Sequence, residues 1–317
     1  MANTAVLLLS FGTPSAKSEL VPYMTSIRRG CVPNDKEIES LNYRYTAIEQ
    51  WDNYNLQTMA IQQGEVLQEQ LYTENLKVPV YVGYLHVPSE DNLYSIANQV
   101  KAIVNDGYSH IVAIVTAPFY SVAGTGDYER KLQTIVDTYE DVQLTFIQSW
   151  WTYSQFMDYW VQAIAPYVGH NKQEQNQDRR HTPFSEHSVF IFSAHSVPVG
   201  ESESYRIDLE RAAQILVQRL GIERYRLAFQ SAPPRPGWLE PSIESIIAEV
   251  LQDGAQRIVF VPFGFVSAHV EVLYDNDIDC KALVEEGAAL YERVPMPNRH
   301  SLFIEAMTSA VIERIKK

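Results

Sequence analysis

Residues 259–281 read VFVPFGFVSAHVEVLYDNDIDCK, an apolar run that leads directly into an acidic segment. The run VFVPF predicts a buried strand, and the acidic segment predicts a helix over residues 271–286. Glu271, Asp275 and Asp279 recur every fourth residue, which places them within an arc of about 80° on an α-helix. Like charges in this arrangement repel and destabilise the helix, and a bound cation or a proton-transfer role would compensate for that cost. A solvated acidic face is the simpler interpretation. Their position after a strand's carboxyl end favours a functional role.

The rest of the chain repeats this alternation of short apolar runs and longer amphipathic segments. Strands are predicted at residues 6–9, 78–84, 111–117, 144–147, 189–193, 226–229 and 258–263. Helices are predicted at residues 56–71, 92–105, 128–139, 155–168, 204–220, 240–252, 271–286 and 301–316. Alternation of this kind predicts an α/β protein with parallel sheets that helices cover on both faces.

The sequence also predicts two similar halves. The tripeptides NDG at 105–107 and QDG at 252–254 each precede a strand that is followed by proline, a weak sign of duplicated doubly wound units. The polar stretch GHNKQEQNQDRRHTPFSEH at 169–187 lacks apolar periodicity and predicts a connection. We therefore predict two domains, of residues 1–168 and 188–317. Packing of the last helix against the first domain is compatible with this division.

Composition and charge exclude several classes of protein. The chain has 317 residues, 46% of them hydrophobic and 20% charged, which suits a soluble globular protein with a sizeable core. The formal charge of −14 argues against nucleic acid as a partner, because phosphate binding needs a surplus of Lys and Arg. A cationic ligand such as a metal ion is favoured instead.

Cysteine content and the terminal sequence indicate a cytoplasmic protein. Cys31 and Cys280 are too few for a disulfide framework or for an iron–sulfur cluster held by four thiolates. The first residues, MANTAVLLLSFGTP, lack a basic segment and predict a buried strand and not a signal peptide. No run approaches the roughly 20 apolar residues of a membrane helix. We expect a monomer, because no exposed apolar stripe stands out.

A second candidate site is the segment SAHSVP at 193–198, which follows the apolar run VFIF. His195 would lie at the carboxyl end of a strand, although a lone histidine is more often structural. A neutral imidazole is a good ligand for iron and other divalent metals, and a carboxylate such as Glu271 can share the metal or accept protons. The two would form an open site, because no Cys/His spacing supplies the four ligands of a structural zinc site.

Other candidate sites are weaker. Residues 124–126, GTG, lack the rest of a dinucleotide fingerprint, so nucleotide binding is disfavoured. Serines flank His195, but no GxSxG elbow is present, which disfavours a hydrolase. Arg28 and Arg29, and Arg44 with the neighbouring Tyr45, offer groups for ligand carboxylates, although paired surface arginines are commonly solvated or salt-bridged.

Together these motifs resemble the ferrochelatases, and most of all the coproporphyrin III ferrochelatases of Gram-positive bacteria. The likeness rests on SFGTP, IRRG, RYTAI, SAHSVP and PFGFVSAHVEVLYDND, in that order, and it extends over nearly the whole chain. It implies two Rossmann-like domains with a porphyrin cleft between them. It also implies insertion of the substrate Fe2+ into a porphyrin, with no permanently bound cofactor and no iron–sulfur cluster.

The resemblance further implies roles for single residues. His195 and Glu271 match the metal-binding and catalytic pair that faces across the porphyrin plane, and Asp275 and Asp279 match an acidic path for the metal. Six positions match residues of the family that bind the porphyrin: Phe11, Arg28, Arg44, Tyr45, His86 and Tyr128.

Three places depart from the family pattern. Residues 49–55, EQWDNYN, stand where relatives carry a shorter Gly-Gly-x-Ser-Pro-Leu segment, Phe11 replaces a tyrosine and Ala268 replaces an aspartate. The first hypothesis is a lyase that inserts Fe2+ into coproporphyrin III to form coproheme. The alternatives are a protoporphyrin IX ferrochelatase, a porphyrin- or haem-binding protein with weak or lost chelatase activity, and a chelatase for cobalt or nickel.

Overall fold

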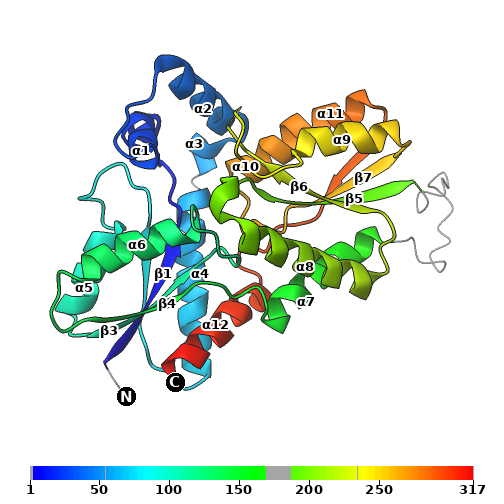
Figure 1. Ribbon diagram of the computed structural model, residues 1–317. Coiled ribbons are helices and arrows are strands. Elements are labelled where there is room, and N and C mark those ends of the chain that lie inside the picture. The colour runs from blue at the N-terminus through cyan, green and yellow to red at the C-terminus, as the bar shows by residue number, and fades with distance from the viewer. Residues whose placement is uncertain (1–2, 54, 169–186, 234, 317) are drawn as a thin grey trace. The chain divides into compact units, whose positions relative to one another are not determined.

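In the part of the chain that the structure describes, helices flank two four-stranded parallel sheets (Figure 1). The computed structural model describes residues 3–53, 55–168, 187–233 and 235–316. The chain divides into two units, one of Met1–Phe156 with Pro297–Lys317 and one of Met157–Met296. The predicted fold class, α/β with parallel sheets, is confirmed. Most of the predicted connection, residues 169–186, lies outside the described residues.

The sheet of the first unit has the strand order β2-β1-β3-β4. Because strands β2 and β3 lie on opposite sides of β1, the order reverses direction beside β1, and in open parallel sheets ligands bind at the carboxyl ends of the strands at such a point. The central strand is buried on both faces, as its run of leucines predicts. The strands are β1 (Thr4–Ser10), β2 (Val80–Tyr84), β3 (His110–Val115) and β4 (Gln143–Ile147).

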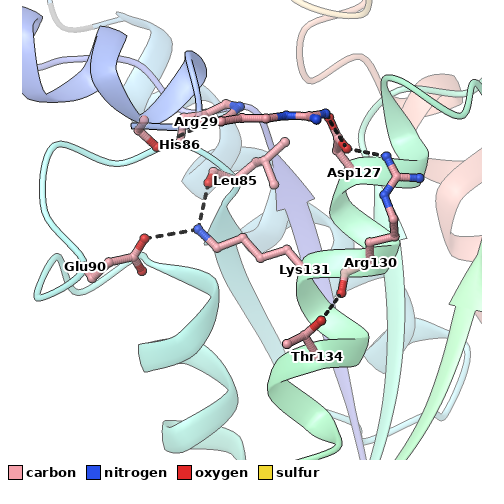
Figure 2. Close-up of a pocket in the computed structure, with 9 residues that line it drawn as sticks. Arg29, Leu85, His86, Glu90, Asp127, Arg130, Lys131 and Thr134 are labelled. Carbon is pink, nitrogen blue, oxygen red and sulfur yellow. Dashed lines mark hydrogen bonds and ion pairs between the residues drawn. The ribbon is translucent and has the colours of Figure 1, made fainter. Parts of the chain in front are cut away.

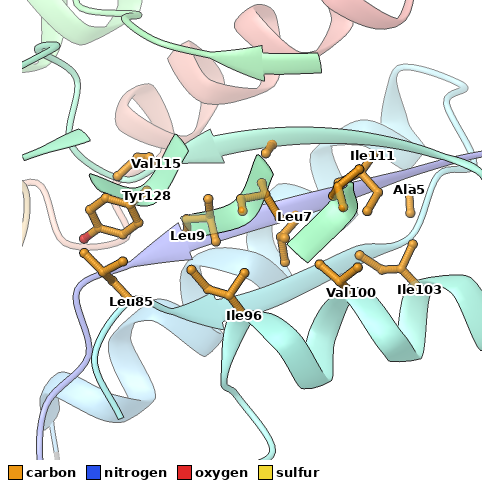
Figure 3. Close-up of a cluster of buried hydrophobic side chains, with 13 residues drawn as sticks. Ala5, Leu7, Leu9, Leu85, Ile96, Val100, Ile103, Ile111, Val115 and Tyr128 are labelled. Carbon is orange, nitrogen blue, oxygen red and sulfur yellow. The ribbon is translucent and has the colours of Figure 1, made fainter. Parts of the chain in front are cut away.

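Helices cover both faces of this sheet. Figure 3 shows Leu7 and Leu9 of β1 packed with Ile96 and Val100 of the helix that follows β2. On the opposite face of the sheet, Gly64 of the helix at residues 55–73 lies close to Leu8 of β1. The helices of the unit are α1 (Leu20–Ile27), α2 (Asp35–Ala47), α3 (Gln50–Asn53), α4 (Asn55–Thr73), α5 (Ile96–Asn105), α6 (Thr125–Val136) and α12 (Ser301–Ile315), with a 3-10 turn at Lys17–Glu19.

The last helix belongs to the first unit. Helix α12 packs along α4, and the Thr308 hydroxyl donates a hydrogen bond to Gln70 Oε1 at 2.7 Å. Phe303, Met307 and Val311 are fully buried. The carboxyl-terminal residues therefore stabilise the sheet that the amino-terminal residues build.

The second unit repeats the plan with the strand order β6-β5-β7-β8. Here the order reverses beside β5, the strand that ends at His195. The strands are β5 (Ser188–His195), β6 (Tyr225–Gln230), β7 (Arg257–Val261) and β8 (Leu290–Arg293). The helices are α7 (Ser154–Ile164, which begins in the first unit), α8 (Glu203–Leu220), α9 (Ile243–Gln252), α10 (Val270–Leu273) and α11 (Lys281–Glu286), with 3-10 turns at Ala165–Tyr167 and Val199–Glu201.

The predicted helix over residues 271–286 is not continuous. A π-helical segment, η4 (Asp275–Cys280), separates α10 from α11. The wider turn is evident from the Asp279 N–H, which donates to Tyr274 O at 3.0 Å, five residues back. The prediction of a regular α-helix is therefore wrong at this place.

The seven predicted strands are all present, while β8, α1, α2 and α3 had no counterpart in the prediction. No helix in the described part of the chain is long and apolar enough to cross a membrane.

Candidate functional site

The chain segments that leave β5 and β7 meet at one edge of the second sheet, because these strands are parallel neighbours. After β7 the chain turns at Gly264, whose N–H donates to Ser193 O at 3.1 Å. A Cβ atom on Gly264 would lie 2.4 Å from Ala194 Cβ and 2.7 Å from Ala194 Cα, closer than real Cβ contacts allow. Glycine therefore lets the turn before α10 approach the end of β5, where His195 lies.

This approach brings His195 and Glu271 together. His195 Nε2 lies 3.3 Å from Glu271 Oε1, with the two side chains 39% and 28% exposed. The other ring nitrogen, Nδ1, lies 2.5 Å from the carbonyl oxygen of Ser196. Because a carbonyl can only accept, Nδ1 carries a hydrogen, and Nε2 is the atom available to a metal or a proton.

The surroundings of His195 favour its protonated form. Burial lowers the pKa of His195, but the negative charge and hydrogen bond of Glu271, with the hydrogen bond to Ser196, outweigh burial and raise the pKa to about 9. At neutral pH a proton therefore lies between Nε2 and the carboxylate. A metal ion that binds Nε2 must replace this proton.

Buried amides hold the backbone of Glu271. The Gln230 side chain at the end of β6 donates from Nε2 to Glu271 O at 2.6 Å. Its Oε1 accepts from Asn276 Nδ2 at 3.2 Å. Gln230 is also the register partner of His195 in the sheet. These contacts fix the start of α10 relative to the sheet edge.

The other acidic residues of the predicted ladder are less enclosed. Asp275 is partly buried and accepts a hydrogen bond from Ser231 Oγ at 2.7 Å, while Asp279 is exposed. In an α-helix, two residues four apart differ by about 40° in their angular position around the axis. The wider π turn rotates less per residue, so it offsets this difference along the acidic ladder. Within the described residues, no three His, Cys, Asp or Glu side chains gather closely enough to hold a metal ion together. The structure thus brings together a pair and not a closed set of ligands.

The sequence did not predict a site role for His269 or Tyr205. His269 is the N-cap of α10: its Nδ1 accepts from the Glu271 N–H at 3.2 Å, and its ring contacts Phe265 at 5.0 Å. Burial lowers the pKa of His269 although Glu271 opposes this effect. Tyr205 donates to the His195 carbonyl oxygen at 3.3 Å. The sequence did contain one feature that could have indicated this role: His269 directly precedes a helix whose first turn is acidic.

In the first unit, Phe11 and His86 lie together at the carboxyl ends of β1 and β2. Their rings are 4.7 Å apart at 63°, and Phe11 is 45% exposed. His86 Nδ1 lies 3.1 Å from Ser26 Oγ. Gly12 permits this arrangement, because its φ is +92° and a Cβ there would lie 2.1 Å from His86 O.

Burial lowers the pKa of His86 to about 4, with a further lowering from Lys131 that Asp127 partly offsets. His86 is therefore neutral at physiological pH, unlike His195. Its imidazole can accept or donate hydrogen bonds without carrying charge.

The remaining predicted residues of this unit lie in different surroundings. Arg28 is paired with Glu37 at 2.5 Å, and Glu37 also closes the capping box of α2. Arg44 is partly exposed on α2. Tyr45 is 3% exposed and its ring meets Trp51 edge-on at 5.2 Å, while Tyr128 is 6% exposed within the core of Figure 3.

Trp51 belongs to the segment 49–55 that departs from the family pattern, of which residue 54 lies outside the described residues. Its Nε1 donates to Thr46 Oγ1 at 3.1 Å. The segment is therefore tied to the end of α2 at this residue.

Two solved structures with a similar fold are forms of the chelatase SirB. The protein is similar to the sirohydrochlorin chelatase SirB from Bacillus subtilis subspecies spizizenii in complex with cobalt, with a TM-score of 0.59 and 10% identity over 100% of this chain and 96% of that one. It is equally similar to SirB from Bacillus subtilis with Fe3+, with a TM-score of 0.59 and 14% identity over 99% and 95% of the two chains. The fold is thus of the chelatase class.

Sequence comparison is more specific. The sequence model of the ferrochelatase family matches residues 3–315. The chain is 32% identical to the coproporphyrin III ferrochelatase of Bacillus pumilus (strain SAFR-032), over 98% of this chain and 96% of that protein. It is 31% identical to the coproporphyrin III ferrochelatase of Anoxybacillus flavithermus (strain DSM 21510 / WK1), with the same coverage. The chain belongs to the ferrochelatase family of metal chelatases, as the sequence motifs predicted.

Proposed function

We propose that the protein inserts Fe2+ into coproporphyrin III and releases coproheme. The observation that carries this proposal is the His195–Glu271 pair, which sets a metal-binding nitrogen 3.3 Å from a carboxylate at the edge of the second sheet. The choice of porphyrin is supported by relatives of about one-third identity that are named coproporphyrin III ferrochelatases.

Metal insertion requires that Fe2+ lose water and that two pyrrole nitrogens lose their protons. We assign metal binding to Nε2 of His195, because Nδ1 is committed to Ser196. Glu271, 3.3 Å from Nε2, can accept the proton that the metal replaces, and we also assign to it the acceptance of protons from the porphyrin. The pair can therefore exchange protons for a metal ion without a permanently bound cofactor or an iron–sulfur cluster.

Asp275 and Asp279 extend the acidic surface beyond the pair. Asp275 is anchored by Ser231, and Asp279 is exposed. We assign to them the attraction of Fe2+ and the removal of protons, since carboxylate oxygens exchange both cations and protons with water.

Porphyrin binding in the first unit is assigned to the six residues of the family pattern. Phe11 offers an exposed aromatic ring beside His86, and Arg28 and Arg44 offer charges for carboxylates. Tyr45 and Tyr128 are nearly buried, so their contribution is limited to their small exposed edges. We further propose that the protein is a monomer and acts in the cytoplasm.

An anaerobic assay tests this function. Fe2+ insertion by the purified protein is followed by visible absorbance with coproporphyrin III and with protoporphyrin IX. We expect faster turnover of coproporphyrin III. Preference for protoporphyrin IX would contradict the proposed substrate, and tight binding of both porphyrins without insertion would identify a porphyrin carrier.

A further inference from the structure

A pocket of about 440 Å3 lies beside His86 in the first unit (Figure 2). Charged side chains from α6, from the turn after α1 and from the loop after β2 line much of it. They are Arg29, Glu90, Asp127, Arg130 and Lys131. None of them is among the residues that the family pattern assigns to the porphyrin.

The pocket is electropositive although the chain as a whole is acidic. Three cationic side chains face two carboxylates, which leaves one positive charge in excess, whereas the formal charge of the chain is −14. His86 is neutral at physiological pH and does not change this balance. An anionic group is therefore the ligand that the pocket favours.

The cations keep hydrogen-bond donors available in spite of their ion pairs. Arg29 and Arg130 share Asp127, and the Arg29 contacts are long, at 3.3 Å. Lys131 donates to Glu90 Oε1 and to Leu85 O, both at 3.2 Å (Figure 2). An ammonium group has three donors, so Lys131 retains one for a further acceptor.

Glu90 holds Lys131 only loosely. The Glu90 side chain is 67% exposed and that of Lys131 is 30% exposed. Ion pairs this exposed contribute little to stability, so a ligand carboxylate can share Lys131 or displace Glu90 at small cost.

His86 connects this pocket with Phe11, the other residue of this end of the sheet to which porphyrin binding is assigned. Its ring contacts the exposed ring of Phe11 and also lines the pocket. A macrocycle that lies against Phe11 and His86 would bring a carboxylate side arm to the pocket. We propose that the pocket binds one carboxylate arm of the porphyrin, with Lys131 as its principal donor. This inference rests on the proposed function, because that function supplies a ligand with carboxylate arms.

The test uses two variants that break the same ion pair with opposite charge changes. Lys131→Gln removes the donor, whereas Glu90→Gln removes the competitor and leaves Lys131 charged. We expect the Kd of metal-free coproporphyrin III, measured by fluorescence quenching, to rise about fivefold in Lys131→Gln and to fall about threefold in Glu90→Gln. A merely structural ion pair would move both values in the same direction.

Matched controls separate the pocket from general charge effects. Lys101→Gln and Glu140→Gln make the same charge changes at exposed positions of the same unit that do not line the pocket. Salt screens exposed charges that do not contact the ligand, so we expect neither control to change the Kd. Control shifts as large as those of the pocket variants would overturn the proposal.

Two further outcomes would also overturn it. One is an unchanged coproporphyrin III affinity, or equal weakening, in both pocket variants. The other is a rise of Tm with inorganic phosphate that Lys131→Gln abolishes while porphyrin affinity stays unchanged, which would assign the pocket to free phosphate. Because binding is measured without metal, failure of the parent protein to insert iron would not affect this result.

Discussion

The side-chain amide of Gln230 donates a hydrogen bond to the backbone carbonyl oxygen of Glu271 at 2.6 Å. Gln230 is also the register partner of His195 across β5 and β6. One side chain therefore ties the helix that carries the carboxylate to the strand next to the histidine. Asn276, fully buried in the π-helical segment, completes the link through Gln230 Oε1.

Replacing Gln230 with leucine should slow metal insertion without preventing folding. The change removes the donor to Glu271 and one partner of the buried Asn276 amide, which costs about 1–3 kcal/mol of the free energy of unfolding. We expect kcat to fall about tenfold at an unchanged KM for the porphyrin, because the carboxylate is displaced but retained. Steady-state kinetics and urea unfolding measure both effects. Reduced stability at an unchanged kcat would contradict a positioning role.

The titration of His195 should depend on Glu271. In the parent, the carboxylate raises the pKa of His195 to about 9, so the imidazole is protonated at neutral pH. In Glu271→Gln that charge is absent, and burial, which lowers the pKa, is then opposed only by the hydrogen bond to Ser196 and the charge of Asp275. We expect NMR titration to show a large downward shift of the His195 pKa in the variant. An identical titration in both proteins would mean that the pair does not form in solution.

Gly264→Ala should destabilise the second unit. The new methyl group would lie 2.4 Å from Ala194 Cβ and 2.7 Å from its Cα, and the contact with backbone cannot relax by rotation of a side chain. We expect a loss of about 1–3 kcal/mol in the free energy of unfolding, measured in urea. Gly200→Ala is the matched control, because no atom lies within 4 Å of the place that its new methyl group would take. Equal stability of the two variants would argue against close packing at Gly264.

His110 should make the first sheet sensitive to acid. Its Nδ1 lies 3.2 Å from Thr4 Oγ1 and its Nε2 lies 2.9 Å from Thr145 Oγ1, so it links β1, β3 and β4. Burial lowers the pKa of His110, so the unfolded chain binds a proton first. Its stabilising contribution is present above the unfolded pKa of about 6.5 and is lost as the pH falls through the folded value.

Urea unfolding of the parent and of His110→Leu at neutral and mildly acidic pH tests this point. We expect the parent to lose more of its free energy of unfolding on acidification than the variant. Equal losses would show that other groups account for the acid sensitivity of the protein.

Sequence patterns were sufficient for the strands that carry the core. The run VLLL in β1 and the run VFIF in β5 are apolar on both faces, as central parallel strands require. Strand β8, LYER, was not predicted because it is a short edge strand with a half-exposed, mixed sequence. Helix α2 is polar overall, but its capping box of Asn34 and Glu37 was a readable start signal.

The π-helical segment could not be predicted from spacing. Its geometry reflects tertiary contacts: Asn276 bonds to Gln230, and Asp277 is paired with Arg293 at 2.6 Å and accepts from Tyr291 at 2.8 Å. Fourfold spacing of acidic residues fits an α-helix equally well.

Because His195 and Glu271 both follow the carboxyl ends of predicted strands, the sequence predicted that they are neighbours. The structure places His195 Nε2 3.3 Å from Glu271 Oε1. Nothing in the sequence indicated how far Tyr45 and Tyr128 are buried, because aromatic residues serve in cores and binding sites alike. The pocket beside His86 was also not predicted, since its charged residues come from three separate segments.

In the proposed function, His195 and Glu271 together exchange protons for Fe2+. The most direct measurement is the anaerobic rate of Fe2+ insertion into coproporphyrin III for the parent, His195→Ala and Glu271→Gln. His187→Ala, at an exposed histidine of the same unit, serves as the control. We predict losses of about 100-fold or more in both site variants, with porphyrin binding retained and the control unaffected. Full insertion rates in His195→Ala would contradict the role of the pair.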